Sequence, residues 1–294
     1  MRKINTRVLV SGPEYFTNHD AINILMNPSE KVDPVKAKEE HSMIIDAFKQ
    51  AGIEVLKINP PKDCQDGVYT ANWALIIEGK AILSRLPNTR KPEEQYARSI
   101  LEQLGLKSIT LPDNIKAFSG QGDSLTIDNY IFCQSPYRTD PKAHQFLKNF
   151  FKDKMIISLQ TKPSRWLKWG PRKINSITGW PDSPTYDLDL ALAILKPASA
   201  NQKALIAYCP SLFKRRSRKL LKSLSEVDMI AVSKDEALKS YALNLVSTGE
   251  TVILNSGTIN LKADLIKHNF KIIELELPEL KKGGGSIRCC SLSL

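Results

Sequence analysis

Residues 41–58 read HSMIIDAFKQAGIEVLKI. The first part places apolar side chains three and four positions apart, which is typical of an amphipathic helix, and the part after a small Ala-Gly break is typical of a short strand. The same pattern returns in ARSILEQLGLKSITL from Ala97, HQFLKNFFKDKMIISL from His144, SRKLLKSLSEVDMIAV from Ser217 and LKADLIKHNFKIIEL from Leu261. Because self-similarity along a chain reflects a repeated architectural unit, the sequence predicts five copies of one unit.

The repeats also predict where strands begin and how they pair. The strands that follow the helices are expected to begin near Ile53, Lys107, Lys154, Asp228 and Lys271. Candidate hairpins come after them, in NWALIIEGKAILSRL, DSLTIDNYIFCQ, DLDLALAIL with KALIAYC, and NLVSTGETVIL. Turn pairs such as Glu78-Gly79 and Asp128-Asn129 carry residue types that tolerate the positive φ of tight turns. Each repeat is therefore predicted to be a ββαβ unit.

The stretch GGGSIRCCSLSL (283–294) decides how the units are joined. After IIELEL only one short alternating segment remains, so the last repeat lacks a strand. The N-terminal TRVLVSG can supply it, with SLSL pairing against VLV near residue 9. Closure of this kind removes exposed sheet edges, as in propellers and barrels. The sequence predicts a single domain, residues 1–294, in which five units close a ring.

Composition indicates a folded globular chain. Hydrophobic residues make up 42% and charged residues 25% of the sequence, and no apolar run approaches the roughly 20 residues of a bilayer span. The start, MRKINTRVLVSGPEYF, lacks the apolar run of about 7–15 residues of a secretory signal, so a cytoplasmic protein with no membrane contact is expected. The five cysteines are odd in number and form no CxxC pair, which indicates neither a disulfide framework nor a metal site.

The net charge of +11 permits two interpretations. It could serve an acidic partner such as RNA, or it could belong to a lysine-rich solvated surface. The basic residues are spread out, which favours the second interpretation, so no nucleic-acid partner is expected. The densest run, KRRSRK (214–219), lies in a predicted helix with an apolar face and is interpreted as the solvated side of that helix.

Residues at equivalent strand starts would converge on one axial cavity of a five-unit ring. These positions hold Asn72, Asp123, Asp187 with Asp189, Asn244 and Cys289. Carboxylates, amides and a thiol suit a cationic ligand that is rich in hydrogen-bond donors. The alternative is that they are polar turn residues at strand ends.

At these residues the chain resembles the guanidino-group-modifying enzymes of the pentein fold, a family that includes dimethylarginine dimethylaminohydrolase, arginine deiminase, arginine dihydrolase and amidinotransferases. The resemblance runs nearly end to end, through GPEYFTNHDAINILMNP, GVYTANWALI, FSGQGDSL, TYDLDLALAIL and GGGSIRCCSLSL. VYTANWAL looks most like the arginine dihydrolases and their amidinotransferase-annotated relatives. The resemblance implies an α/β propeller of the pentein type, with five ββαβ units in pseudo-fivefold symmetry around a central cavity.

The resemblance also implies a chemistry. A cysteine thiolate attacks the guanidinium carbon, an amine leaves, and water hydrolyses the covalent adduct, without a metal or organic cofactor. Cys289 is then the nucleophile, and Cys290 is expected on the opposite face of the strand. Attack needs the thiolate, and a neighbouring cation lowers the pKa of a thiol, a role for Arg288 or the bound guanidinium. The other three cysteines are expected to pack in the core: Cys64, Cys133 and Cys209.

Further site residues follow from the same likeness. Asp123, in GQGD, resembles the family's acidic residue near the substrate, and Asn23 and Asn72 fall where the dihydrolase branch carries asparagines near the guanidino group. Amide oxygens accept guanidinium N–H bonds. Arg90 and Arg138 fall in stretches where relatives place arginines on the substrate carboxylate, a bidentate contact that arginine suits.

The sequence departs from the family pattern at two positions. The family's general acid is a histidine in a His-x-Asp element, which here reads Asp187-Leu188-Asp189, and the family's glutamate before GQGD is Ser119. An aspartate is normally anionic at neutral pH and protonates a leaving amine only if its pKa is raised greatly. One carboxylate leaves at Ser119 and one appears at Asp187, so the two changes could offset each other in charge.

None of the four histidines is an obvious substitute for the missing one. His41, His144 and His268 fall in or near helices on the outside of the ring, so they are expected to be surface or packing residues. His19, in the loop GPEYFTNHDAIN, is the remaining candidate.

Two hypotheses follow from these observations. The first is an amidinohydrolase, deiminase or amidinotransferase acting on arginine or an arginine derivative through a cysteine adduct. The second is a catalytically impaired pentein that holds a cationic ligand or an acidic partner. The oligomeric state, a homo-oligomer included, stays open.

Overall fold

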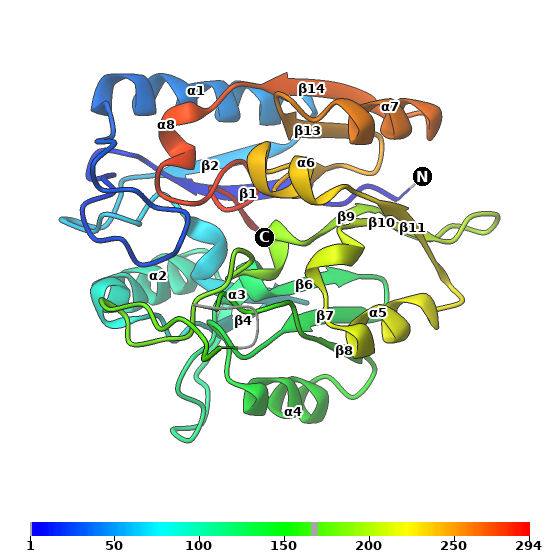
Figure 1. Cartoon of the computed structure of the whole chain (residues 1–294), viewed down its shortest axis with the longest axis horizontal. Helices are drawn as coiled ribbons and strands as arrows, with labels where there is room; N and C mark the ends of the chain where they lie inside the picture. The colour runs from blue at the N-terminus through cyan, green and yellow to red at the C-terminus, as the bar shows by residue number, and fades with distance from the viewer. Residues whose placement is uncertain (1, 166–169) are drawn as a thin grey trace.

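Five three-stranded sheets form the framework of the computed structural model, which describes residues 2–165 and 170–294 (Figure 1). In chain order the sheets contain β1 (Arg7–Ser11), β2 (Glu54–Ile58) and β15 (Leu292–Ser293); β3 (Ala74–Ile77), β4 (Lys80–Leu83) and β5 (Lys107–Ile109); β6 (Ser124–Ile127), β7 (Tyr130–Gln134) and β8 (Met155–Leu159); β9 (Leu192–Lys196), β10 (Ala204–Tyr208) and β11 (Val227–Ala231); and β12 (Val246–Ser247), β13 (Thr251–Asn255) and β14 (Lys271–Leu275). The strand predicted after each helix is found within one residue of its expected start.

Each sheet has the same pairing, which confirms the predicted ββαβ unit. The central strand pairs antiparallel with one neighbour and parallel with the other, as β4 does with β3 and β5. A helix connects the two parallel strands in every unit: α1 (Pro34–Gln50), α2 (Lys91–Gln103), α4 (Pro141–Phe150), α5 (Arg215–Lys222) and α7 (Ile259–Lys267). The turn of the β3–β4 hairpin has positive φ at Glu78 and Gly79, as their residue types predicted.

N-terminal capping explains why α1 begins several residues before the amphipathic pattern in the sequence. The pattern begins at His41, whereas α1 begins at Pro34. Asp33 accepts hydrogen bonds from the backbone N–H groups of Val35 and Lys36, and a proline at the first position of a helix needs no hydrogen-bond partner for its nitrogen. An Asp-Pro pair starts α4 in the same way.

Both ends of the chain complete one sheet. β15 pairs antiparallel with β1, with Val8 opposite Ser293 and Leu9 opposite Leu292, as predicted. Figure 1 shows the C-terminus in the middle of the molecule and the N-terminus near its edge. The expectation that Cys290 lies on the opposite face of this strand is wrong, because residues 287–290 form a turn and β15 begins only at Leu292.

Short helical turns stand at the inner ends of three hairpins. These are η1 (Thr70–Asn72) before β3, α3 (Gly120–Asp123) before β6, and η3 (Leu188–Leu190) before β9. The remaining short elements are η2 (Asn88–Arg90), η4 (Pro210–Leu212), α6 (Lys234–Lys239) and α8 (Pro278–Lys281). The three inner turns carry Asn72, Asp123 and Asp189 to the axis of the ring, where the turn holding Cys289 also lies.

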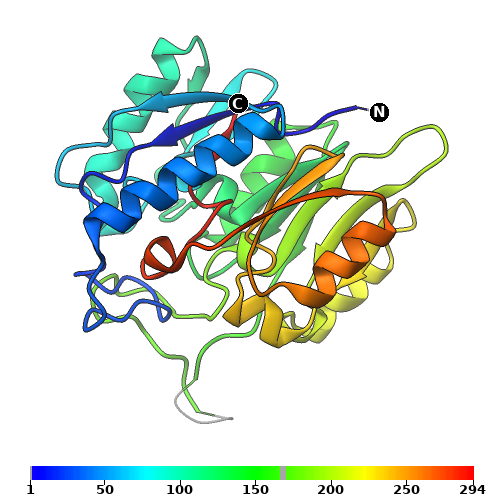
Figure 2. The ribbon, with the colours of Figure 1, turned by 90° about the horizontal axis from the view of Figure 1, so that it is seen from above.

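The core consists of several apolar clusters between the sheets and the outer helices. One of them joins α1 to β1 and to the end of the chain, and it includes Ile44, Phe48 and both Cys289 and Cys290. Viewed from above, α1 runs along the sheet of β1 and β2, and α7 covers the sheet of β13 and β14 (Figure 2). Among the described residues, no helix has the length and hydropathy needed to cross a membrane.

Candidate active site

Asn244 fixes the turn that carries Cys289. Its side-chain oxygen accepts hydrogen bonds from the backbone N–H groups of Ser286 and Arg288 at 3.1 Å each and of Cys289 at 3.3 Å. Its side-chain nitrogen donates to Cys289 Sγ at 3.1 Å. One fully buried amide therefore sets both the backbone of this turn and the direction of the thiol.

Asp189 is the second partner of the thiol. Cys289 Sγ donates to Asp189 Oδ2 at 3.2 Å, and both side chains are buried. Burial, with the nearby Asp187 carboxylate, raises the pKa of Asp189 to about 8. Burial also raises the pKa of Cys289 well above its ordinary value, and the carboxylates of Asp189 and Asp187 act in the same direction. In the free protein this sulfur is a thiol.

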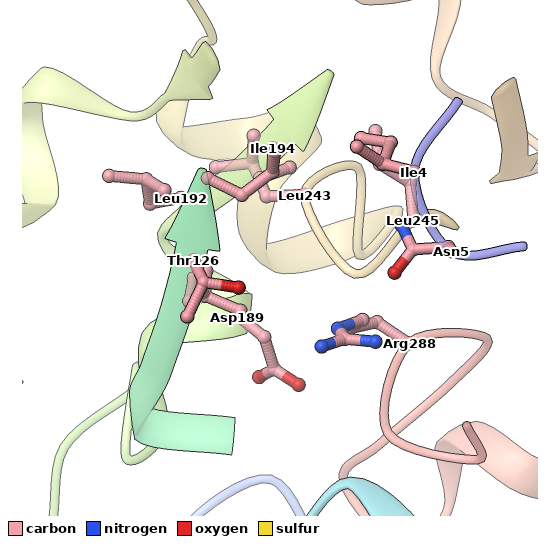
Figure 3. Close-up of a pocket in the computed structure, with 11 residues that line it drawn as sticks. Ile4, Asn5, Thr126, Asp189, Leu192, Ile194, Leu243, Leu245 and Arg288 are labelled. Atoms are coloured by element: carbon pink, nitrogen blue, oxygen red, sulfur yellow. The ribbon is translucent and has the colours of Figure 1, made fainter. Parts of the chain in front are cut away.

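The direction of this shift is opposite to the one expected from Arg288. The Arg288 guanidinium donates to Ser293 Oγ at 3.0 Å and to Gln121 Oε1 at 2.9 Å. Figure 3 shows it beside Asp189 at one end of a small cavity of about 40 Å³. Within the described part of the chain, Asp189 Oδ1 has no hydrogen-bond partner. In the free chain, desolvation and the nearby carboxylates outweigh the effect of the adjacent Arg288 on the pKa of Cys289, which leaves the bound guanidinium as the candidate for lowering it.

The two departures from the family pattern touch each other. Ser119 Oγ donates to Asp187 Oδ1 at 2.8 Å, and Asn72 Nδ2 donates to Asp187 Oδ2 at 2.7 Å. Asn72 Nδ2 is also 2.9 Å from Ser119 Oγ. A Cβ at Gly122 would overlap Asn72 Nδ2 and lie 2.8 Å from Asp187 Oδ2, so only glycine leaves room for this contact. Both oxygens of Asp187 therefore accept hydrogen bonds from side chains of the site.

Asp123 is the third buried carboxyl of the site. Its Oδ2 accepts the Thr139 hydroxyl at 2.7 Å, and its Oδ1 accepts from Gln134 Nε2 at 3.2 Å and from the backbone N–H of Leu188 at 3.1 Å. Burial, followed by the charge of Asp187, raises its pKa well above the usual value despite these donors. Asp123, Asp187 and Asp189, which have almost no solvent contact, thus lie near enough to interact electrostatically, and a cluster of this kind suits a cation.

The structure places Arg90 behind Asn72. Its guanidinium pairs with both oxygens of Glu93, at 2.8 and 2.7 Å, and donates to Asn72 Oδ1 at 2.8 Å. Its remaining bonds go to the backbone oxygens of Asp66 and Tyr69. The sequence suggested a contact with a substrate carboxylate, but the donors of this buried side chain are engaged inside the protein, and the bond to Oδ1 turns the Asn72 amide so that its NH₂ faces Asp187.

Arg138 and Asn23 lie against the loops that cover the site. Arg138 stacks over the Tyr186 ring, 4.3 Å from its centroid, and donates to the backbone oxygen of Ile22 at 2.9 Å. Asn23 Nδ2 donates to the backbone oxygen of Gly283 at 3.1 Å. Asn23 therefore ties the N-terminal loop to the glycine loop that leads to Cys289.

The structure does not bring the histidines to the thiol. His19 is exposed, and His41 is buried beside the backbone of Ser11, where burial lowers its pKa to about 4. His144 contacts Ser158 and the backbone oxygen of Gln134. Within residues 2–165 and 170–294, no group of three or more His, Cys, Asp and Glu side chains is arranged to hold a metal ion.

Three contacts of the site were missed in the sequence. Gln134 and Thr139 hold Asp123, and Glu93 holds Arg90. Gln134 carried a usable signal, because it is a polar residue that closes the apolar strand YIFCQ. Thr139 and Glu93 carried none, since a threonine in a loop and a glutamate in the first turn of a helix are ordinary there.

Comparison with known proteins identifies similar sequences. The model of the family N,N dimethylarginine dimethylhydrolase, eukaryotic, matches residues 12–161. N(G),N(G)-dimethylarginine dimethylaminohydrolase of Mycobacterium tuberculosis is 28% identical over 290 residues, covering 98% of this chain and 85% of the relative. The bifunctional arginine dihydrolase/ornithine cyclodeaminase ArgZ of Synechocystis is 24% identical over 290 residues. This match covers 97% of the present chain but only 37% of ArgZ.

A solved structure shows the same fold. The N-terminal domain of ArgZ, covalently bound to a reaction intermediate, matches with a TM-score of 0.80 at 23% identity, over 97% of this chain and 96% of that chain. The family match, the five ββαβ units and this superposition lead to one conclusion: the chain belongs to the N,N dimethylarginine dimethylhydrolase family, within the guanidino-group-modifying proteins of the pentein fold.

Proposed function

We propose that this chain is a single-domain guanidino-group-modifying enzyme that acts on arginine or an arginine derivative through a covalent adduct on Cys289. The observation that carries the proposal is the position of Cys289 Sγ, which is held between Asn244 and the buried Asp189, with the carboxyl group of Asp187 nearby. By name, the relative from Mycobacterium tuberculosis acts on dimethylarginine and ArgZ acts on arginine, and the N-terminal domain of ArgZ has been solved covalently bound to a reaction intermediate. The alternative of a non-catalytic binding protein is not favoured by relatives that are enzymes.

A guanidinium would change the ionisation of this site. In the free protein, burial raises the pKa values of Asp123, Asp189 and Cys289, which favours the protonated forms of these groups. A cation bound among them favours the charged form of each carboxyl group and of the thiol. Substrate binding would therefore release a proton from Asp189 to solvent and leave a carboxylate at 3.2 Å from the sulfur. The substrate supplies the activating charge that Arg288 does not.

Asp189 then replaces the missing histidine in the proton transfers. Its Oδ2 accepts the thiol proton as Cys289 Sγ forms a bond to the guanidinium carbon. The same proton passes from Asp189 to the leaving amine as the C–N bond breaks, which leaves an amidino thioether on the sulfur. Water attacks that carbon, Asp189 takes a proton from the water, and the C–S bond breaks to release a ureido product and restore the thiol. An acceptor amine in place of water would give group transfer.

The remaining residues would position the substrate. Asp123 and Asp187 would accept guanidinium N–H bonds, and Ser119 and Asn72 hold Asp187 in place. Arg138 is the better candidate for binding a substrate carboxylate. One of its N–H groups donates to the backbone oxygen of Ile22, and its guanidinium stacks on the Tyr186 ring. Arg90, Asn23 and Arg288 are then positioning residues, acting through Asn72, the glycine loop and the final turn.

The test is a product assay on the purified chain. Arginine and its methylated derivatives are incubated with the wild type and with the Cys289→Ala variant, and citrulline, ornithine, ammonia and released methylamines are measured. Product from the wild type with none from the variant supports the proposal. A Cys290→Ala variant, which changes the neighbouring thiol, should keep activity within about threefold. Equal background from wild type and Cys289→Ala would overturn it.

A further inference from the structure

A second, strongly basic groove lies on the outside of the ring, between α4 and α5. Both helices pack against β8, and Figure 1 shows the three elements together at the lower edge of the molecule. The groove has a volume of about 580 Å³, within the range of roughly 300–1,000 Å³ usual for small-molecule sites. Its basic side chains are Lys148 on α4, Lys214 before α5 and Arg216 on α5.

These three cations have no acidic partner in the part of the chain that the structure describes. Among the described residues that line the groove there is no aspartate or glutamate, and no ion pair within residues 2–165 and 170–294 involves Lys148, Lys214 or Arg216. Lys214 Nζ donates to the neutral Gln160 Oε1 at 2.9 Å. Burial lowers the pKa of Lys214, and the nearby charges of Arg172 and Arg165 lower it further. Unbalanced positive charge therefore accumulates at the α5 side of the groove.

Other surface grooves of the same ring contain acidic side chains beside their cations. The groove beside α2 contains Lys91 and Arg85, and these pair with Glu94 at 2.7 Å and Asp113 at 3.1 Å. A third groove, between β10 and the end of α7, contains Asp228 among its lysines. A lysine-rich surface alone explains those grooves, but it does not explain a groove that gathers cations without an acidic side chain.

The floor of the groove is connected to the candidate active site. His144 lines the groove, with Nε2 at 3.2 Å from the backbone oxygen of Gln134 and Nδ1 at 3.0 Å from Ser158 Oγ. A carbonyl oxygen only accepts, so Nε2 carries the proton and Nδ1 accepts from the hydroxyl. The side chain of the same Gln134 donates to Asp123 Oδ1 at 3.2 Å. Two hydrogen bonds thus separate the groove from a carboxyl of the site.

We propose that this groove binds a phosphorylated small molecule and that its occupancy alters the site around Asp123 through His144 and Gln134. Lysine and arginine side chains are the usual partners of phosphate oxygens. Ile156 and Leu220, which are half-buried on the wall of the groove, offer an apolar surface for an organic group next to the phosphates. The site is distinct from the one that would hold the guanidino compound, and its existence does not depend on the proposed reaction.

Binding is tested by titration calorimetry with two probes, ATP and inorganic tripolyphosphate. Both should bind the wild type, and the charge-reversed variant Lys148→Glu/Arg216→Glu should lose at least about tenfold in affinity. Lys148→Glu/Arg215→Glu is the matched control, because Arg215 is exposed on the same turn of α5 but does not line the groove; it should retain about threefold more affinity than the first variant. Tighter binding of ATP indicates an organic phosphate, and equal binding indicates that phosphate charge is sufficient.

The outcomes that overturn the proposal are equally distinct. They are no binding of either probe, equal loss in both double variants, or a single-stranded RNA that occupies the groove about tenfold more tightly than ATP. The coupling has its own readout, the rate at which a haloacetamidine alkylates Cys289. Saturating ATP should change this rate at least about twofold in the wild type and not in His144→Gln. ATP that binds without changing the rate would refute the coupling, whether or not the protein turns over a guanidino substrate.

Discussion

Asp187 and Ser119 are hydrogen-bonded to each other, so the presence of one residue explains why the other is tolerated at its position. The serine hydroxyl and the Asn72 amide donate to the two oxygens of Asp187, the position at which the family resemblance implies a histidine. A glutamate in place of Ser119 would set two carboxylates against each other in a site that already holds Asp123 and Asp189. The two departures therefore belong together physically.

This pairing predicts non-additive mutations. Ser119→Glu should be strongly destabilising because of the added buried charge, and Asp187→His should leave the Ser119 hydroxyl and Asn72 amide with a poorer acceptor. The double variant would restore a Glu and His pair, and its unfolding free energy should exceed the additive value by about 1–2 kcal/mol. Urea unfolding of the four proteins measures this coupling. Additive changes would show that the two positions are independent.

The raised pKa of Asp189 predicts that the free energy of unfolding depends on pH. Its pKa is raised to about 8 in the folded chain, so the folded state holds a proton that the unfolded state has released. The unfolding free energy should therefore fall as pH rises from the unfolded pKa toward the folded one. The useful window is about pH 7 to 8, above the range in which the depressed pKa of His41 acts in the opposite direction.

The measurement compares the wild type with Asp189→Asn by urea unfolding across that window. The variant should show a smaller loss of stability with rising pH, because an amide has no proton to release. Asp228→Asn, on an exposed residue of β11, is the control and should keep the wild-type slope. Identical slopes for Asp189→Asn and the wild type would mean that Asp189 is already ionised in the folded protein.

At the scale of elements, the turn of residues 286–290 depends on a side chain from another repeat. Asn244 precedes β12 and accepts three backbone N–H bonds of this turn. Asn244→Ala should lower the unfolding free energy by about 2–4 kcal/mol, since the buried donors lose their acceptor. Asn244→Asp keeps an acceptor but removes the amide that donates to Cys289, so it should fold better than the alanine variant and alkylate more slowly. Equal stability of all three proteins would contradict this role.

Much of the element level could be predicted, and the reasons for the exceptions are specific. The strand starts and the convergence of Asn72, Asp123, Asp189, Asn244 and Cys289 followed from the repeat, because equivalent ends of five units meet at one axis. The turn at Cys290 could not be predicted, because SLSL alternates like a strand and only its pairing with β1 shows where the strand begins. The position of Arg90 depends on Glu93 and on carbonyls that face it only after folding.

For the whole molecule, the pairing of the two ends of the chain in β1 and β15 closes the ring, and this closure lies close in sequence to Cys289. Leu292 is fully buried and packs with Leu9 and Trp73, only three residues from Cys289. Leu292→Ala should cost about 2–4 kcal/mol of unfolding free energy and increase the alkylation rate of Cys289, because a loosened closure exposes the thiol. Leu294→Ala, the same change at a partly exposed position, should cost less than about 1 kcal/mol. Similar losses would show that closure does not depend on β15.

The central claim is that Cys289 forms a covalent adduct with a guanidino carbon, and acid-quenched mass spectrometry tests it most directly. The wild type is mixed with arginine or dimethylarginine, quenched in acid within the first turnovers and digested. The account predicts an amidino-type mass increase on the peptide that contains Cys289 in the wild type, and no such increase in Cys289→Ala. An unmodified Cys289 peptide in samples that nevertheless form product would contradict the account.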